Sequence, residues 1–111
     1  RERLQSVDGL TIQNDPPWGR SNAWLTVMCF DTRRYPDASR RVREALAMNL
    51  IESRPIWKPM HRQPIFRDNP SFLSGRADDL FSEGLCLPSG TNLEATDIDR
   101  ISAVIEATTR A

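Results

Sequence analysis

Three prolines in the middle of the chain constrain its fold more than any other feature. Pro55, Pro59 and Pro64 lie in residues 51–66, which read IESRPIWKPMHRQPIF. Proline fixes φ and has no backbone N–H, so a segment with this spacing is a poor helix and a poor central strand. The same segment contains the only lysine and the only histidine of the chain. We therefore predict a stiff loop that presents a fixed set of side chains.

Before this loop, the hydrophobic pattern predicts two strands and a helix. Residues 9–13 are a possible short strand, and the Asn-Asp-Pro-Pro sequence at 14–17 forces a turn or an extended loop. Residues 24–31 form a continuous apolar run, which predicts a fully buried strand. A helix is predicted to begin at residues 35–37, where a proline and an acid suit the first turn. The inward stripe of this helix consists of Ala38, Val42, Ala45, Leu46 and Asn49.

After this helix, the pattern predicts shorter elements on both sides of the central loop and one last helix. Residues 51–53 are a short strand, residues 77–83 a short helix closed by a glycine, and residues 85–87 a brief strand. Thr96 is predicted to be the N-cap of the last helix. The apolar stripe of that helix is Ile98, Ile101, Val104 and Ile105. This order predicts an α+β fold, in which a small antiparallel or mixed sheet is covered on one face by helices.

Composition and charge exclude several classes of function. Fifteen basic and fifteen acidic residues cancel, so the chain lacks the one-sided field expected of a nucleic-acid or membrane-surface binder. We interpret its basic cluster as a solvated loop and helix face; the cluster consists of Arg33, Arg34, Arg40, Arg41 and Arg43. The longest apolar run is far too short to span a bilayer. The predictions are one small domain with no nucleic-acid and no membrane partner.

The two cysteines point to a reducing compartment. Cys29 and Cys86 each lie inside an apolar run, and they form no C-x-x-C spacing. Such residues are typical of small buried hydrophobes, not of a disulfide framework or a zinc site. With a single histidine, no metal site is predicted. We expect a cytoplasmic protein.

The central loop offers candidate binding residues, with two interpretations left open by the residues alone. Lys58 as a nucleophile would need a phosphate cradle and an acid for a cofactor nitrogen, and the sequence presents neither. Lys58 and His61 could instead donate to an anionic or hydroxyl-rich ligand. Alternatively, Trp57 and Met60 belong to the core and Lys58 is a charge at its rim. Ser89 lacks the flanking glycine of a nucleophile elbow and is interpreted as a turn residue.

Two stretches of the chain resemble a known enzyme family. Residues 51–66 and residues 84–93, which read GLCLPSGTNL, resemble the C-terminal part of the DegT/DnrJ/EryC1/StrS aminotransferases, as does Ser21-Asn22 before the buried strand. These are pyridoxal-phosphate enzymes that act on nucleotide-linked keto-sugars. The resemblance covers about residues 9–107. Its central sequence is most similar to that of members that aminate UDP-linked 4-keto-6-deoxy-N-acetylhexosamines.

This resemblance implies that the chain is a part of a larger enzyme. Residues 9–111 would be the small domain of a fold-type I pyridoxal-phosphate transferase, and residues 1–8 the end of a linker or helix from a large N-terminal domain. That large domain would carry the Schiff-base lysine and pyridoxal 5'-phosphate, so this chain alone is expected to bind no cofactor and to be inactive. The implied partners are a UDP- or dTDP-keto-sugar, an amino-acid donor, commonly glutamate, the large domain, and a second subunit in a homodimer.

The resemblance also assigns the residues of the central loop. Lys58 does not match the Schiff-base lysine, and no catalytic, cofactor-binding or metal-binding residue is expected in this chain. Lys58 and His61 would donate to hydroxyl or phosphate oxygens of the sugar nucleotide, while Trp57 and Met60 shape the wall of the site. Arg62 departs from the apolar or aromatic residue usual after the histidine. The alternatives are a stand-alone, non-catalytic binding or oligomerisation module of the same fold, and a regulatory or degenerate relative.

Overall fold

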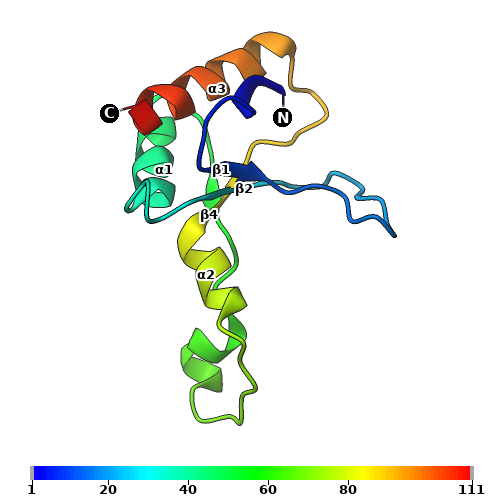
Figure 1. Cartoon of the computed structure of the whole chain (residues 1–111), viewed down its shortest axis with the longest axis vertical. Helices are drawn as coiled ribbons and strands as arrows, with labels where there is room; N and C mark the ends of the chain where they lie inside the picture. Colours follow the sequence, from blue (N-terminus) through cyan, green and yellow to red (C-terminus); the bar gives the residue numbers. More distant parts are fainter. Residues whose placement is uncertain (1, 111) are drawn as a thin grey trace.

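An antiparallel sheet of four strands in the order β1-β2-β4-β3 carries the fold (Figure 1). The computed structural model describes residues 2–110, so Arg1 and Ala111, at the outer ends of the two predicted domain ranges, lie outside the described residues. The strands are β1 (Leu10–Ile12), β2 (Thr26–Phe30), β3 (Arg54–Pro55) and β4 (Gly84–Leu87). The helices are α1 (Ala38–Met48), α2 (Arg76–Glu83) and α3 (Ala95–Arg110), with short 3-10 helices η1 (Glu2–Leu4), η2 (Met60–Arg62) and η3 (Pro64–Phe66). The predicted α+β class is confirmed.

Helices α1 and α3 cover one face of the sheet (Figure 1). Side chains alternate between the two faces along a strand, and the register places Met28 of β2 opposite Leu85 of β4. Both side chains are fully buried on the helix-covered face. They pack in one cluster with core residues of the helices, which are Ala38, Val42, Leu46, Ile101 and Ile105. Covering of one face by helices, as the hydrophobic stripes predict, is confirmed.

The opposite face of the sheet is formed by the alternate residues of β2 and β4. Val27 pairs with Cys86, and Cys29 pairs with Gly84. A Cβ atom on Gly84 would clash with Cδ1 of Ile56 and would lie 2.7 Å from the carbonyl oxygen of Leu80. Ile56 therefore packs directly over the glycine backbone and anchors the chain where it leaves β3.

The strand predicted at residues 51–53 is wrong, because the edge strand β3 consists of Arg54 and Pro55. Ile51 closes the preceding helix instead: its N–H donates to the carbonyl oxygen of Leu46 at 2.9 Å, and its side chain joins the core. Proline is tolerated in β3 because an edge strand has one side without ladder hydrogen bonds. Ile51, the apolar residue at the start of this segment, therefore packs in the core and does not pair in the sheet.

Two helices begin at other residues than predicted. The predicted start at 35–37 precedes α1, whose N-cap is Asp37 with a left-handed φ of 57°. Thr96 is not an N-cap, since it already lies within α3. Asp97 supplies the capping contact: its Oδ2 accepts the Glu94 N–H at 3.0 Å, as in the returning half of a capping box.

Two long connections project from the sheet (Figure 1). Residues 13–25 join β1 to β2. Residues 56–75, which we call the arm, join β3 to α2 and contain η2 and η3. The sequence predicted only a loop here, and the arm indeed forms no core, because Phe72 is fully exposed and Ile65 largely so.

The turn after α1 leads to a stability prediction. Leu50 has a left-handed φ of 56° at the position after the helix where glycine is favoured. A residue with a Cβ atom is less stable in this conformation by about 1–2 kcal/mol. The Leu50 side chain is almost fully exposed, so removing it loses little packing. We expect Leu50→Gly to raise the free energy of unfolding, measured by urea denaturation, by about 1 kcal/mol.

The matched control is Met48→Gly, at an exposed residue in the last turn of α1. Its backbone is helical, so glycine is expected to lower the free energy of unfolding by about 1 kcal/mol. A loss of stability in both variants would contradict the prediction, because it would mean that the left-handed backbone of Leu50 carries no cost.

Candidate functional site

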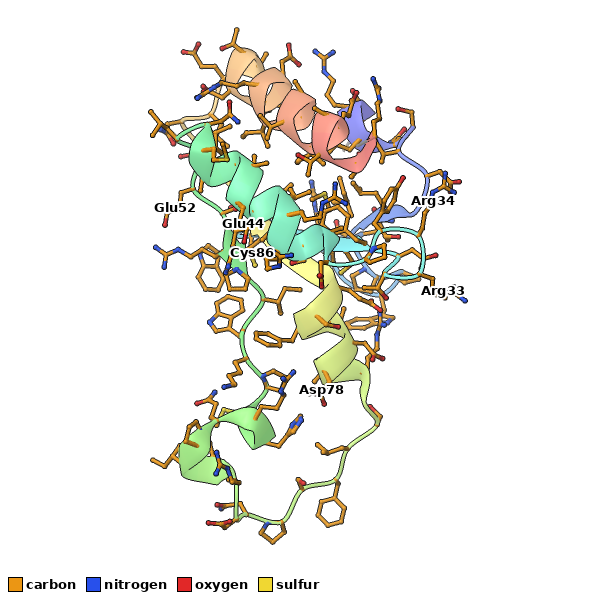
Figure 2. The ribbon with its side chains drawn as sticks, turned by 90° about the vertical axis from the view of Figure 1, so that its left-hand side faces the viewer. Arg33, Arg34, Glu44, Glu52, Asp78 and Cys86 are labelled. Atoms are coloured by element: carbon orange, nitrogen blue, oxygen red, sulfur yellow. The ribbon has the colours of Figure 1, made fainter. Side chains whose placement is uncertain are left out.

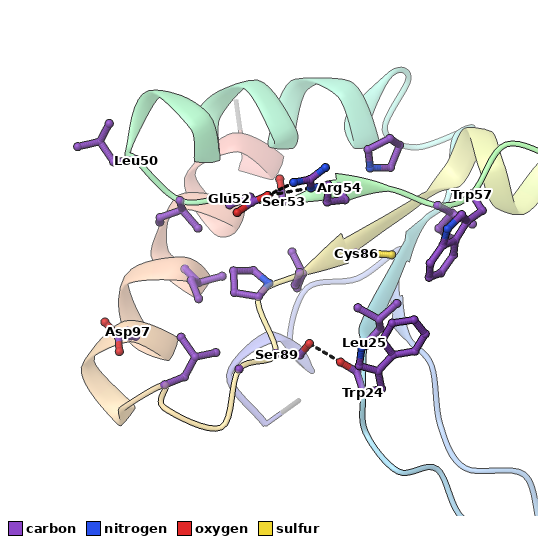
Figure 3. Close-up of a pocket in the computed structure, with 18 of the residues that line it drawn as sticks. Trp24, Leu25, Leu50, Glu52, Ser53, Arg54, Trp57, Cys86, Ser89 and Asp97 are labelled. Atoms are coloured by element: carbon purple, nitrogen blue, oxygen red, sulfur yellow. Dashed lines mark hydrogen bonds and ion pairs between the residues drawn. The ribbon is translucent and has the colours of Figure 1, made fainter.

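An open and mainly apolar groove of about 980 Å³ lies along the edge strand β3 (Figure 3). Its size falls at the upper end of the range for small-molecule sites. Its walls come from the connection between α1 and β3, the start of the arm, the turn after β4 and the first half of α3. Segments far apart in the chain thus meet at one edge of the sheet.

Two tryptophans contact each other at this groove. The ring centroids of Trp24 and Trp57 are 5.9 Å apart at an interplanar angle of 41°, and both side chains are about two-thirds exposed, at 68% and 65%. Ser89 holds the first of them in place, because its Oγ donates to the Trp24 carbonyl oxygen at 2.7 Å (Figure 3). Exposed, rigid aromatic rings provide contact area at a low cost in conformational entropy, as recognition sites require.

The four residues predicted to contact a substrate fall into two pairs. Trp57 and Lys58 line the groove, whereas Met60 and His61 lie in η2 and are not among its lining residues. Trp57 and Met60 are more than half exposed, so neither belongs to the core. Gln63 links the pairs, since its Nε2 donates to the Lys58 carbonyl oxygen at 3.3 Å and to the Met60 Sδ at 3.4 Å.

The charged groups of the groove are largely engaged within the chain. Glu52 forms an ion pair with Arg54, and Asp97 accepts the hydrogen bond that caps α3. Lys58, in contrast, has no carboxylate partner among residues 2–110. Ser53 Oγ is buried beside the groove without a hydrogen-bond partner in the same range. Arg100, which also lines the groove, likewise has no carboxylate partner in this range, and its guanidinium donates to the Asn49 carbonyl oxygen. The groove therefore presents the Lys58 ammonium, without a carboxylate partner, among aromatic and aliphatic side chains.

These residues do not build a complete pyridoxal-phosphate site. Such a site needs a Schiff-base lysine together with an acid that pairs with the pyridine nitrogen. Lys58 is the only lysine of the chain, and the two carboxylates that line the groove, Glu52 and Asp97, are already engaged. The described residues do not fit the cofactor by themselves.

The two cysteines are unsuited to nucleophilic or metal-binding chemistry. Burial raises the pKa of both the Cys29 and the Cys86 thiol, and the Glu83 carboxylate raises the pKa of Cys29 further. Both thiols are free and stay protonated at neutral pH, whereas the thiolate is the reactive form. Within residues 2–110, no group of three or more histidine, cysteine or acidic residues could hold a metal ion.

The basic cluster was interpreted from the sequence as a solvated surface. Arg33 pairs with Asp31, and Arg40 pairs with Glu44, so both arginines carry carboxylate partners on exposed surface. This arrangement agrees with the interpretation of the cluster as a solvated face.

In the part of the chain that the structure describes, no helix has the length and apolar character needed to cross a membrane.

Sequence reasoning missed two residues that shape the site. Trp24 was assigned only to a buried strand, yet it precedes β2, and its ring contacts that of Trp57, which follows β3 on the other side of β4. Asp78 was not singled out, although its carboxylate lies 2.8 Å from His61. No local signal separated Trp24 from the strand, because it begins a continuous apolar run and its exposure is visible only in the structure. No local signal connects Asp78 with His61, because the contact depends on the path of the arm.

Sequence comparison relates the chain to one enzyme family. The sequence pattern of the DegT/DnrJ/EryC1/StrS aminotransferase family matches residues 1–106. EpsN of Bacillus subtilis (strain 168), which is named as a pyridoxal phosphate-dependent aminotransferase, is 36% identical over 112 residues. The match covers 95% of this chain and 27% of EpsN.

Solved structures of aminotransferases contain the same fold. PseC of Helicobacter pylori, an aminotransferase involved in the biosynthesis of pseudoaminic acid, matches with a TM-score of 0.82 and 16% identity over 98% of this chain and 29% of its own. TlmJ of Streptoalloteichus hindustanus matches with a TM-score of 0.78 and 23% identity over 98% of this chain and 28% of its own. At these identities the likeness shows the fold alone. The chain spans less than a third of the length of each of these proteins.

Proposed function

The chain belongs to the DegT/DnrJ/EryC1/StrS aminotransferase family, and we propose that its residues 9–111 form the C-terminal small domain of a pyridoxal-phosphate-dependent sugar aminotransferase. Residues 1–8 would end a linker or helix from a larger N-terminal domain. The complete enzyme would transfer an amino group, from glutamate as donor, to a nucleotide-linked 4-keto-sugar. The observation that carries this proposal is the groove of Trp24, Trp57 and Lys58 in a chain of this family.

We place the cofactor in the larger domain and the recognition of substrate in this one. Two observations support this division: the groove does not fit pyridoxal phosphate, and the matched aminotransferases extend well beyond the matched part. Bound pyridoxal phosphate supplies an electron sink for amino transfer. The small domain would close one side of the active site. The complete enzyme would be a homodimer located in the cytoplasm.

The groove offers distinct contacts to the two halves of a sugar nucleotide. The Lys58 ammonium would donate charge-assisted hydrogen bonds to phosphate or hydroxyl oxygens. The Trp24 and Trp57 rings would cover the apolar face of the sugar or the base and exclude water from it. Met60 and His61 would extend this wall. His61 engages Asp78 through Nε2, which leaves its Nδ1 as the ring nitrogen for a ligand.

The complete reading frame around this chain tests the proposal. We expect an upstream domain with its own lysine, and a polypeptide that binds pyridoxal phosphate stoichiometrically, as measured by absorbance, with Lys58→Ala as well as without it. The same polypeptide should convert a UDP-linked 4-keto-6-deoxy-N-acetylhexosamine to its amino sugar with glutamate as donor, as followed by mass spectrometry.

The opposite results would overturn the proposal. A true start codon at or near Arg1 would exclude the larger enzyme. A saturable cofactor absorbance of this chain that Lys58→Ala abolishes would mean that the chemistry is misplaced. A start codon there without cofactor binding would favour the second candidate, a stand-alone, non-catalytic binding or oligomerisation module. The exposed apolar groove is the observation that keeps this candidate in view.

A further inference from the structure

We propose that Asp78 is a positioning residue, which fixes the arm on helix α2 and thereby holds Lys58 at the groove. Its carboxylate contacts two consecutive residues of η2: His61 Nε2 lies 2.8 Å from Oδ2, and Arg62 Nη1 lies 3.5 Å from Oδ1. Figure 2 shows Asp78 on the part of α2 that lies beside the arm. This inference rests on the proposed function, because it assigns a task to Lys58 in substrate binding.

A second contact reinforces the first on the same face of the helix. Phe81 follows Asp78 by three residues, so the two side chains are neighbours on one face of α2. The Arg62 guanidinium lies over the Phe81 ring, 5.2 Å from its centroid. The His61 side chain is only 21% exposed and that of Asp78 35%, so bulk water screens their contact only in part. We call Asp78, His61 and Arg62 the clamp.

Apolar packing does little to hold the arm. Its start is anchored by Ile56 on the backbone of Gly84, and Pro59 is its buried residue. Beyond η2, the large apolar side chains are mostly exposed; they are Ile65, Phe72 and Leu73. A segment with so few buried contacts opens locally at a low free energy. The clamp is therefore the main tie between η2 and the rest of the fold.

Hydrogen bonds connect the clamp to Lys58. Gln63 follows the clamp residues directly and donates to the Lys58 carbonyl oxygen and to Met60 Sδ. The Gln63 N–H also donates to the Met60 carbonyl oxygen at 3.0 Å, which closes the turn of η2. Residues 58–63 thus form one folded turn with Lys58 at the groove end and His61 at the α2 end. When the clamp opens, Lys58 loses its fixed place above the groove.

Hydrogen exchange in the complete polypeptide that contains this chain tests the clamp without any substrate. We expect Asp78→Asn to speed the exchange of backbone amides in residues 60–67 about tenfold, since the contacts of Asp78 with His61 and Arg62 lose their charged acceptor. Amides of α1 and β2 should keep their exchange rates. The control is Asp79→Asn, which removes the same charge from the same helix turn at an exposed residue outside the clamp. Equal rates in residues 60–67 of both variants would overturn the proposal.

Steady-state kinetics test the link to Lys58. We expect Asp78→Asn to raise the KM for the sugar nucleotide about tenfold and to leave kcat within about twofold, while Asp79→Asn leaves both unchanged. Adding Asp78→Asn to Lys58→Met should raise this KM little further, because both changes remove the same contact. Independent, multiplying effects would overturn the positioning of Lys58 by Asp78. If the polypeptide transfers no amino group, the proposed function fails, and the exchange comparison still decides whether the clamp exists.

Discussion

Replacing Leu85 with alanine is expected to lower the free energy of unfolding by about 3–5 kcal/mol, the largest effect that we predict. Leu85 lies in β4, which pairs with β2 on one side and β3 on the other, and its side chain is fully buried opposite Met28. Alanine would leave a cavity between the sheet and the helices, because the closely packed core around Leu85 relaxes only in part. Chemical denaturation followed by circular dichroism measures the loss.

The control for this change is Leu73→Ala on the arm, where the leucine is 58% exposed. It should alter the free energy of unfolding by less than about 0.5 kcal/mol. Should Leu85→Ala be too unstable to purify, Ile105→Val removes one methylene from a fully buried position of α3. That variant is expected to lose about 0.5–1.5 kcal/mol. Similar losses for the buried and the exposed leucine would contradict the core described here.

Replacing Lys58 with methionine is expected to raise the KM for the sugar nucleotide about tenfold in the complete enzyme. A charge-assisted hydrogen bond contributes about 1.5–3 kcal/mol, and the exposed position of Lys58 places its contribution at the lower end. Methionine keeps most of the length of the side chain and removes the charge. The KM for the amino-acid donor should stay the same, since the groove would contact only the sugar nucleotide. Initial rates with each substrate varied in turn measure both constants.

The matched control for Lys58 is Arg67→Met, which removes an exposed cation of the same arm that does not line the groove. It should leave both KM values unchanged. An equal rise in the KM for both substrates, or an effect of the same size in Arg67→Met, would count against Lys58 as a substrate contact. Such a result would point to the net charge of the arm instead.

The type of most elements was predictable from local patterns. Ala38, Val42 and Leu46 of the predicted stripe are all buried in α1, and the apolar run at 24–31 contains β2. Periodicity succeeds here because one face of each element must be buried in the same core. The errors lie at boundaries, where a local preference competes with a contact from elsewhere. Ile51, for example, is apolar and β-branched like a strand residue, but it fills the core as it closes α1.

The sequence alone was enough to predict the α+β class and the relation to an aminotransferase family, since both follow from local hydrophobic patterns and short motifs. Which residues of the central loop line the groove and which contact α2 was not predictable in this way. Trp57 and Lys58 reach the groove while His61 turns to Asp78, because strand order β1-β2-β4-β3 and the return of the arm along α2 decide which side chains meet. Contacts between residues 24 and 57, or 61 and 78, depend on the register and path of distant segments, and local propensity contains no information about either.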